Sequence, residues 1–224
     1  MPIPIDGNPL ILALLATVIA YFCGCFNGAV IVSKYILRDD VRNHGSGNAG
    51  LTNFYRTFGG PLTFVVILTD VLKAVVAILV GASLFSGIAV DVAWVPYFTI
   101  LGKYWSALFC LLGHMFPCMS HFKGGKGILS GGTIALMMDW RIALVVWGGF
   151  LILAIVTRYV SLGSVWAGAS FPFISWYCYP YFSIVVLAFI IGGLVVWQHR
   201  GNIRRLLHGN ENKFSLHPKR EGKT

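Results

Sequence analysis

Long runs of apolar residues, separated by short polar segments, dominate the chain. An apolar helix needs about 20 residues to cross the hydrocarbon core of a bilayer. Seven stretches approach or reach that length, at about 10–32, 62–84, 92–112, 128–138, 142–156, 160–176 and 180–197. The pattern predicts an all-α integral membrane protein, a helix bundle of about seven transmembrane spans. The stretch 128–138 is the shortest, and a five-span arrangement, with two stretches re-entrant or interfacial, stays open.

Composition agrees with a membrane protein. The 224 residues are 57% hydrophobic and only 11% charged, whereas soluble domains carry about 25% charged residues. This excludes an ordinary soluble enzyme, a disordered chain and a coiled coil. The net charge of +9 could indicate nucleic-acid binding, but the apolar content argues against it and favours a membrane protein with a basic cytoplasmic side.

The cations predict the orientation in the membrane. With seven spans, 14 of the 17 Lys and Arg residues fall on one side, in the loops 33–61 and 113–127, at Arg158 and after residue 197. The positive-inside rule places this side in the cytoplasm, with the N-terminus outside and the C-terminus inside. We expect one transmembrane domain over residues 1–213, a basic helix at the lipid surface over 200–207 and a mobile polar tail over 214–224.

The first polar segment, residues 44–59, combines glycines with Ser, Asn and Thr around a single Arg. Ser46, Thr52 and Asn53 offer short hydrogen-bonding side chains. The guanidinium of Arg56 can bind a phosphate through two parallel hydrogen bonds. The segment suits an anionic ligand, and a flexible loop with one membrane-anchoring Arg is an equally good interpretation.

The second polar segment, residues 113–127, alternates lysines with glycines. Lys123 and Lys126 stand among Gly124, Gly125 and Gly127, and consecutive glycine N–H groups can form a nest for a phosphate. The pattern is not a Walker A loop, which disfavours nucleotide hydrolysis. A basic turn on the cytoplasmic side is the alternative. His114 and His121, seven positions apart, would share one face of a helix, and we favour hydrogen bonding over metal binding for them.

The third polar segment, residues 199–213, follows the last apolar stretch. His199, Asn202 and Glu211 stand there among basic residues. Arg204 and Arg205 fit a membrane anchor, a role that neither Asn202 nor Glu211 suits.

Other polar residues within the apolar stretches have structural interpretations. Asp70 and Lys73 are three positions apart and can form an ion pair on one helix face. The five cysteines, Cys23, Cys25, Cys110, Cys118 and Cys178, are read as small buried apolar residues. No metal site and no cofactor are expected.

In order along the chain, the three segments resemble the signature motifs of the bacterial acyl-phosphate–glycerol-3-phosphate acyltransferase family (the PlsY family). The matching residues are Gly45–Arg56, Gly113–Gly127 and His199–Lys213, with Arg158–Leu162 and the Asp70/Lys73 pair as further points of likeness. The likeness extends to about residue 213. Ala49, Leu51 and Ala74 depart from the commonest family residues without removing a polar group.

The resemblance implies that a fatty acyl group moves from an acyl phosphate to the 1-hydroxyl of glycerol-3-phosphate, giving lysophosphatidic acid and phosphate. Both substrates and the bilayer are the expected partners, in the bacterial cytoplasmic membrane. By resemblance, Ser46, Arg56, His199 and Asn202 are catalytic. The resemblance assigns substrate binding to Lys123, Gly124, Gly125, Lys126, Gly127, Thr52, Asn53 and His114, and a structural role to Glu211, Asp70 and Lys73.

A transporter for phosphorylated small molecules is the competing function. Such a protein would bind its substrate near the membrane midplane, often between inverted repeats. Here the polar segments lie on one side and no repeat is visible, so the acyltransferase interpretation is preferred. The sequence does not define acyl-chain preference or oligomeric state.

Overall fold

The computed structural model describes residues 8–89 and 91–214, and within these ranges every regular element is a helix. The longer helices are α1 (Pro9–Cys25), α4 (Leu62–Ser86), α5 (Val95–Met115), α6 (Ile128–Met138), α7 (Trp140–Thr157), α8 (Val160–Cys178) and α9 (Phe182–Gln198). Shorter ones are α2 (Gly28–Ile31), η1 (Val32–Ile36), η2 (Val41–Asn43), α3 (Leu51–Thr57), η3 (Val92–Trp94), η4 (Cys118–Ser120) and α10 (Arg200–Leu207). The all-helical prediction is confirmed.

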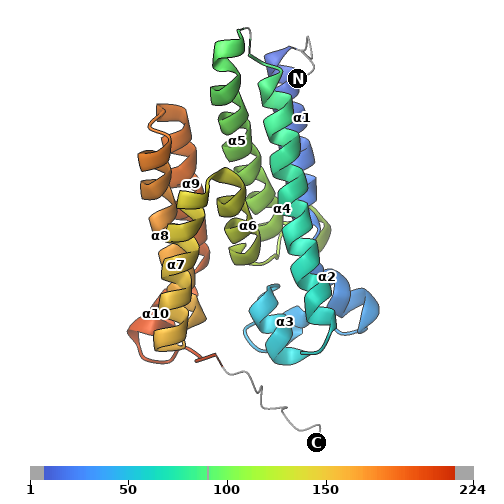
Figure 1. Cartoon of the computed structure of the whole chain (residues 1–224). Helices are drawn as coiled ribbons and strands as arrows, with labels where there is room; N and C mark the ends of the chain where they lie inside the picture. Colours follow the sequence, from blue (N-terminus) through green and yellow to red (C-terminus); the bar gives the residue numbers. More distant parts are fainter. Residues whose placement is uncertain (1–7, 90, 215–224) are drawn as a thin grey trace, which may run out of the picture.

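Two groups of three helices form the bundle. Helices α1, α4 and α5 pack together, α8 packs between α7 and α9, and α6 lies between the two groups (Figure 1). Tyr104, Ile134 and Ile184 come from α5, α6 and α9 and are fully buried in one apolar core. Within the first group, a Cβ added at Gly24 would lie 2.0 Å from the Cys110 carbonyl oxygen, so a glycine is needed where α1 and α5 approach.

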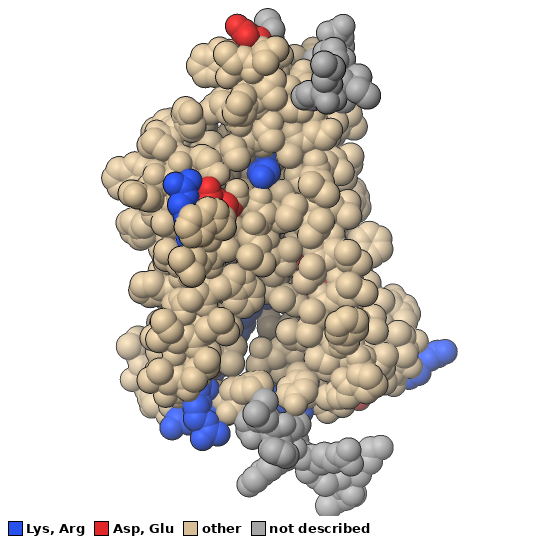
Figure 2. Space-filling view, in the orientation of Figure 1, with Lys and Arg blue, Asp and Glu red and all other residues tan. Residues whose placement is uncertain are grey.

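The outer surface of the bundle is suited to lipid. Large apolar side chains such as Leu10, Phe64 and Ile152 are exposed along the helices. In the face shown in Figure 2, Lys and Arg gather mainly at the end where α3 and α10 lie, and the surface is hollowed close to that end. The apolar sides and the basic end match the composition of a membrane-spanning bundle.

The predicted first span, 10–32, is not one continuous helix. Helix α1 ends at Cys25, and the segment Gly28–Ile36 continues at an angle of 43°. Asn27 causes the break: its side-chain oxygen caps α2 by accepting a hydrogen bond from the Val30 N–H, and its backbone is extended. Hydropathy does not distinguish a capping Asn from an ordinary polar residue inside a span.

The other six apolar stretches coincide with helices, but only some of these helices are long and apolar enough to cross a membrane. Three helical segments are long and apolar enough to cross a membrane, or up to five if each bent pair counts as one span, within the described residues. Helix α6 has 11 residues and rises only about 16 Å, too little to cross the bilayer alone. The count of seven spans therefore stays a prediction.

Candidate active site

The first polar segment is organised by the side chain of Asn53. Its amide nitrogen donates to the carbonyls of Val41 (3.1 Å) and His44 (3.0 Å), and its oxygen accepts from the Ser46 N–H (3.0 Å). Because Asn53 is buried and uses these three bonds internally, it shapes the loop that presents Ser46. The sequence predicted that Asn53 binds substrate, whereas in the structure its side chain binds backbone groups of its own loop.

Three other candidates of this segment keep their side-chain polar groups available. Ser46 is exposed between Gly45 and Gly47, both of which have positive φ, and Thr52 and Arg56 are half-buried on α3. Within the described residues, none of the three side chains makes a hydrogen bond or ion pair.

The second polar segment is built differently from the expected N–H nest. The Gly124 and Gly125 N–H groups already donate to the carbonyls of Met115 and His114, each at 3.1 Å. The two glycines are instead required by close packing, since a Cβ at Gly124 would lie 2.0 Å from the His114 carbonyl oxygen. The nest prediction is therefore wrong for these two amides. Gly127, with φ of 76°, ends the loop as the N-cap of α6.

An arginine that sequence reasoning counted only as a loop cation ties the first two segments together. Arg42 forms an ion pair with Asp40 at 2.6 Å. Its other guanidinium nitrogen donates to the carbonyls of Ser120 (3.2 Å) and Lys123 (3.3 Å). The paired Asp40 raises the pKa of Arg42, so the contact persists at all physiological pH values. The side chain of Lys123 itself is exposed.

A buried ion pair lies deeper in the bundle than these loops. Lys73 and Asp70 pair at 2.6 Å, as their spacing indicated, and Lys73 also contacts the Nδ1 atom of His114 at 2.6 Å. His114 is buried, and its ring packs against the Lys73 ammonium. His121 lies beyond the end of α5 in a left-handed turn, so the expected shared helix face of His114 and His121 is wrong.

The third segment contacts the second through Lys126. Its ammonium donates to the side-chain oxygen of Asn202, the Asn202 amide donates to Glu211 (2.7 Å), and Glu211 accepts from Arg205 (2.7 Å). Burial lowers the pKa of Lys126 to about 8, with a further contribution from the positive charge of Arg205. Burial alone would raise the pKa of Glu211, but the hydrogen bonds from Asn202 and Arg205 outweigh it and lower that pKa.

His199 follows the last residue of α9 and is buried. Its Nδ1 atom lies 2.8 Å from the Val195 carbonyl, so in the neutral ring Nδ1 donates and Nε2 is the acceptor. Burial lowers the pKa of His199 to about 4. The ring is therefore neutral at physiological pH and is a weak base.

The segment after α10 returns to the rest of the bundle. Phe214, the first residue of the expected mobile tail, is held in place: its N–H donates to the Arg158 carbonyl at 2.8 Å, and its ring stacks on Tyr55 of the first segment. The prediction was wrong for Phe214, and residues 215–224 of that tail lie outside the described residues. The three segments thus meet at one end of the bundle, although no hydrogen bond joins Ser46 or Arg56 to Lys126 or His199 in the described part of the chain.

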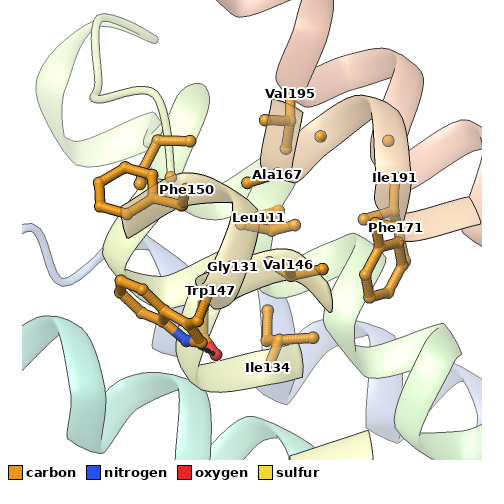
Figure 3. A pocket seen from close by; sticks show the side chains of 15 residues that line it. Leu111, Gly131, Ile134, Val146, Trp147, Phe150, Ala167, Phe171, Ile191 and Val195 are labelled. Carbon is orange, nitrogen blue, oxygen red and sulfur yellow. Dashed lines mark hydrogen bonds between the residues drawn. The ribbon is translucent and has the colours of Figure 1, made fainter. Parts of the chain in front are cut away.

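An apolar pocket begins beside this meeting point. It lies between α6 and α7 on one side and α8 and α9 on the other, with Leu111 of α5 also lining it (Figure 3). Gly127 and Val195 line it next to Lys126 and one turn before His199, while Ile134 and Phe171 line it farther along their helices. All fifteen lining residues are apolar or glycine. Sequence reasoning missed this pocket because its residues are scattered over five helices.

The cysteines are not all buried. Cys118 is exposed on the turn η4, which corrects its assignment as a core residue, and Cys23 and Cys178 are half-buried. The Cys25 and Cys118 thiols form a weak hydrogen bond, with the sulfurs 4.0 Å apart, and are not joined by a disulfide. Within the described residues, no group of three or more His, Cys, Asp or Glu side chains could hold a metal ion.

Apolar helices, a cationic loop cluster at one end and an apolar pocket beside it define an integral membrane protein with its candidate site at one end of the bundle. The sequence model of a family described as glycerol-3-phosphate acyltransferase matches residues 14–209. The chain belongs to this family and is a multi-pass membrane acyltransferase of the PlsY type.

Individual relatives with the same family name align with nearly the whole chain. A glycerol-3-phosphate acyltransferase of Thermoanaerobacter pseudethanolicus is 35% identical over 202 residues, which cover 90% of this chain and 96% of the relative. The enzyme of the same name from Fusobacterium nucleatum is 36% identical over 199 residues, covering 89% and 96%.

Two solved structures have the same fold. Both are crystal structures of PlsY (YgiH), an integral membrane glycerol 3-phosphate acyltransferase. Its glycerol 3-phosphate form is 31% identical with a TM-score of 0.78, covering 91% of this chain and 96% of that one. Its lysophosphatidic acid form is 30% identical with a TM-score of 0.74, covering 91% and 95%.

Proposed function

We propose that this acyltransferase uses a fatty acyl phosphate as its donor and acylates the 1-hydroxyl of glycerol-3-phosphate. The products are lysophosphatidic acid and inorganic phosphate, and the reaction is the first acylation of phospholipid synthesis. The observation that carries the proposal is the position of the apolar pocket: it begins at Gly127 and Val195, directly beside Lys126 and His199. A ligand with a phosphate head and a long apolar chain fits that juxtaposition. The glycerol 3-phosphate and lysophosphatidic acid forms of PlsY support the acceptor and the product.

The polar groups at this end have distinct proposed roles. Lys126 binds the phosphate of glycerol-3-phosphate, assisted by Lys123, because it is the cation at the junction of the second and third segments. Arg56 and Ser46 bind the phosphate of the donor or the charge of the transition state, since their side chains have no protein partner within the described residues. Asn202 positions Lys126 by accepting a hydrogen bond from its ammonium, and Glu211 positions Asn202 by accepting one from its amide. Thr52 is a further substrate contact on α3.

The chemistry needs little activation of the donor, which is a mixed anhydride. The acceptor hydroxyl oxygen attacks the acyl carbonyl carbon, the bond from that carbon to the phosphate oxygen breaks, and phosphate leaves. The protein holds two phosphates, aligns the hydroxyl and stabilises the developing oxyanion. No acyl-enzyme intermediate is required.

The hydroxyl proton passes to a phosphate oxygen of a substrate in this proposal. A strong protein base would need a pKa near the working pH. His199, with a pKa of about 4, does not meet that requirement. Lys126, with a pKa of about 8, does, but in this proposal it binds a phosphate in its charged form and so has no free electron pair to accept the proton. Replacing each titratable residue of the site in turn tests the idea. A single variant that loses kcat by about 10²–10⁴-fold with binding intact would identify a protein base and contradict it.

The proposed site faces the cytoplasm of a bacterium, with the N-terminus outside and the C-terminus inside the cytoplasmic membrane. The cations of the three polar segments support this orientation, because positive charge is retained on the cytoplasmic side. Labelling of Cys118, the exposed cysteine of the second segment, in intact and permeabilised cells checks it. In a variant with Cys178 replaced by Ser, modification of Cys118 by a membrane-impermeant thiol reagent in intact cells would place the site outside.

A comparison of donors tests the reaction. Purified protein is assayed with glycerol-3-phosphate and, in turn, palmitoyl phosphate, palmitoyl-CoA and a palmitoylated carrier protein. We expect lysophosphatidic acid from palmitoyl phosphate and none from the two thioesters. Product from a thioester without acyl phosphate would replace the proposed donor.

A further inference from the structure

A single buried lysine contacts three separate elements of the bundle. The Lys73 ammonium, on α4, donates to Asp70 (2.6 Å), to the Nδ1 atom of His114 on α5 (2.6 Å) and to the Phe26 carbonyl at the end of α1 (3.0 Å). These bonds use all three of its N–H groups. The buried charge is balanced by Asp70, and Lys73 and His114 are both buried. The contact set thus fixes where α1 and α5 end relative to α4.

One of these contacts leads to the first polar segment. Phe26 precedes Asn27, whose side chain caps α2 and whose amide donates to the Ala49 carbonyl at 2.9 Å. Asn27 and Ala49 are both buried. The position of the Phe26 carbonyl on Lys73 therefore sets the position of Ala49, which lies three residues after Ser46.

The other contact leads to the second polar segment. The His114 carbonyl accepts the Gly125 N–H at 3.1 Å. Gly125 lies between the His114 ring and Ala49, since an added Cβ would be 2.3 Å from His114 Nε2 and 2.5 Å from the Ala49 carbonyl oxygen. The two branches from Lys73 meet at Gly125, directly before Lys126.

We infer that Lys73 is a positioning residue, which aligns Lys126 of the second segment with the Ser46 loop through His114 and through Phe26–Asn27–Ala49. It does not touch substrate. The inference rests on the proposed function in one respect, because Lys126 is taken to bind the phosphate of glycerol-3-phosphate. Loss of the alignment then weakens binding of that substrate and leaves the acyl-transfer step largely intact.

The test separates KM from kcat in four variants. Lys73→Met is made together with Asp70→Asn, so that no unpaired carboxylate stays buried. His114→Leu removes the acceptor of the Lys73 bond, whereas His114→Asn keeps an acceptor at the same position. Lys103→Met is the control, because Lys103 is a half-buried lysine on α5 whose ammonium also donates to a backbone carbonyl, that of Met137, away from the loops.

We expect KM for glycerol-3-phosphate to rise about tenfold in the double variant and in His114→Leu, with kcat within about threefold of wild type. His114→Asn and Lys103→Met should keep the wild-type KM. A purely structural role would reduce the amount of folded protein and leave the KM of the folded fraction unchanged, and that result would overturn the inference. Equal effects in His114→Asn and His114→Leu would overturn it as well.

If the charge variants do not fold, Asn27→Ser gives the same readout without disturbing buried charge. Serine retains the cap of α2 but is too short to reach the Ala49 carbonyl. A rise in KM supports the inference, and an unchanged KM overturns it. Wild-type protein assayed in parallel keeps the two proposals apart: if it transfers no acyl group to glycerol-3-phosphate, the proposed function fails, and if it does while the variants keep its KM, only the positioning role fails.

Discussion

The Lys126 ammonium donates a hydrogen bond to the side-chain oxygen of Asn202, which is 76 positions later in the chain. The contact joins the second polar segment to the third. Since the Asn202 amide is held in turn by Glu211, the orientation of Asn202 is fixed with its oxygen toward the lysine. Lys126 is therefore held in place before a ligand arrives, and this makes its role easy to test.

Replacing Lys126 by Ala should raise KM for glycerol-3-phosphate by about tenfold or more, because hydrogen bonds to charged groups contribute about 1.5–3 kcal/mol. Steady-state kinetics with varied glycerol-3-phosphate measure this. Lys123→Ala is the control, since the Lys123 side chain is exposed, and it should have a smaller effect. Unchanged KM and kcat in Lys126→Ala would remove this residue from the site.

The pKa of Lys126, lowered to about 8 by burial, predicts a pH dependence. As pH rises through about 8, the free enzyme loses the positive charge of Lys126, so kcat/KM for glycerol-3-phosphate should fall on the alkaline side. Lys126→Arg keeps its charge at all accessible pH values. The ratio of variant to wild-type kcat/KM should therefore rise between pH 7 and 9.5. A constant ratio would show that Lys126 does not titrate there.

Glu211 is predicted to stabilise the fold more than it assists the reaction. Glu211→Gln keeps an oxygen for the Asn202 amide but loses the charge that pairs with Arg205 at 2.7 Å. The thermal unfolding temperature in detergent should fall, with KM for glycerol-3-phosphate within about threefold of wild type.

The difference in stability between wild type and Glu211→Gln should depend on pH in a predictable direction. Because the folded-state pKa of Glu211 is lowered, its contribution is present at neutral pH and is lost as pH falls through that pKa. The unfolding temperatures of wild type and variant should therefore converge in acid. A difference that grows in acid, or a large change in KM, would contradict the structural role.

The apolar pocket predicts how the enzyme responds to acyl-chain length. Gly131 lines the pocket one turn into α6, and a Cβ added there would meet no atom within 4 Å. Gly131→Leu should therefore fold and fill the pocket. We expect a fall of about tenfold or more in kcat/KM for palmitoyl phosphate and little change for butyryl phosphate, whose chain is too short to reach that depth.

Gly193→Leu is the matched control for the pocket. Gly193, on α9, has equally open surroundings but is exposed and does not line the pocket. This variant should keep the wild-type chain-length profile. Equal losses for long and short donors in Gly131→Leu would show that the acyl chain takes another path.

The apolar pattern predicted most of the fold. The stretch 128–138 coincides with α6, and the other stretches after residue 60 match helices to within a few residues at their ends. The break at Phe26 was not predictable from hydropathy, because hydropathy shows neither that Asn27 caps α2 nor that Lys73, 47 positions later, donates a hydrogen bond to the Phe26 carbonyl. Such a contact is visible only in three dimensions.

The polar segments were identifiable from their composition, but the roles of the individual residues within them were not. Asn53 has the same chemistry as a substrate ligand, and only its three internal hydrogen bonds show that it shapes the loop. The glycine N–H groups at 124 and 125 were expected to be unoccupied, yet carbonyls at the end of α5 accept both. Arg42 gave no signal beyond its charge, since the contacts by which it joins the first two segments are to the backbone carbonyls of Ser120 and Lys123.

The most direct test of the proposed reaction is a stoichiometric assay of the purified protein with palmitoyl phosphate and glycerol-3-phosphate. Lysophosphatidic acid and inorganic phosphate are measured together in each sample. Acyl transfer predicts equal amounts of the two products, both dependent on glycerol-3-phosphate. Phosphate released without lysophosphatidic acid, or no product at all, would contradict it.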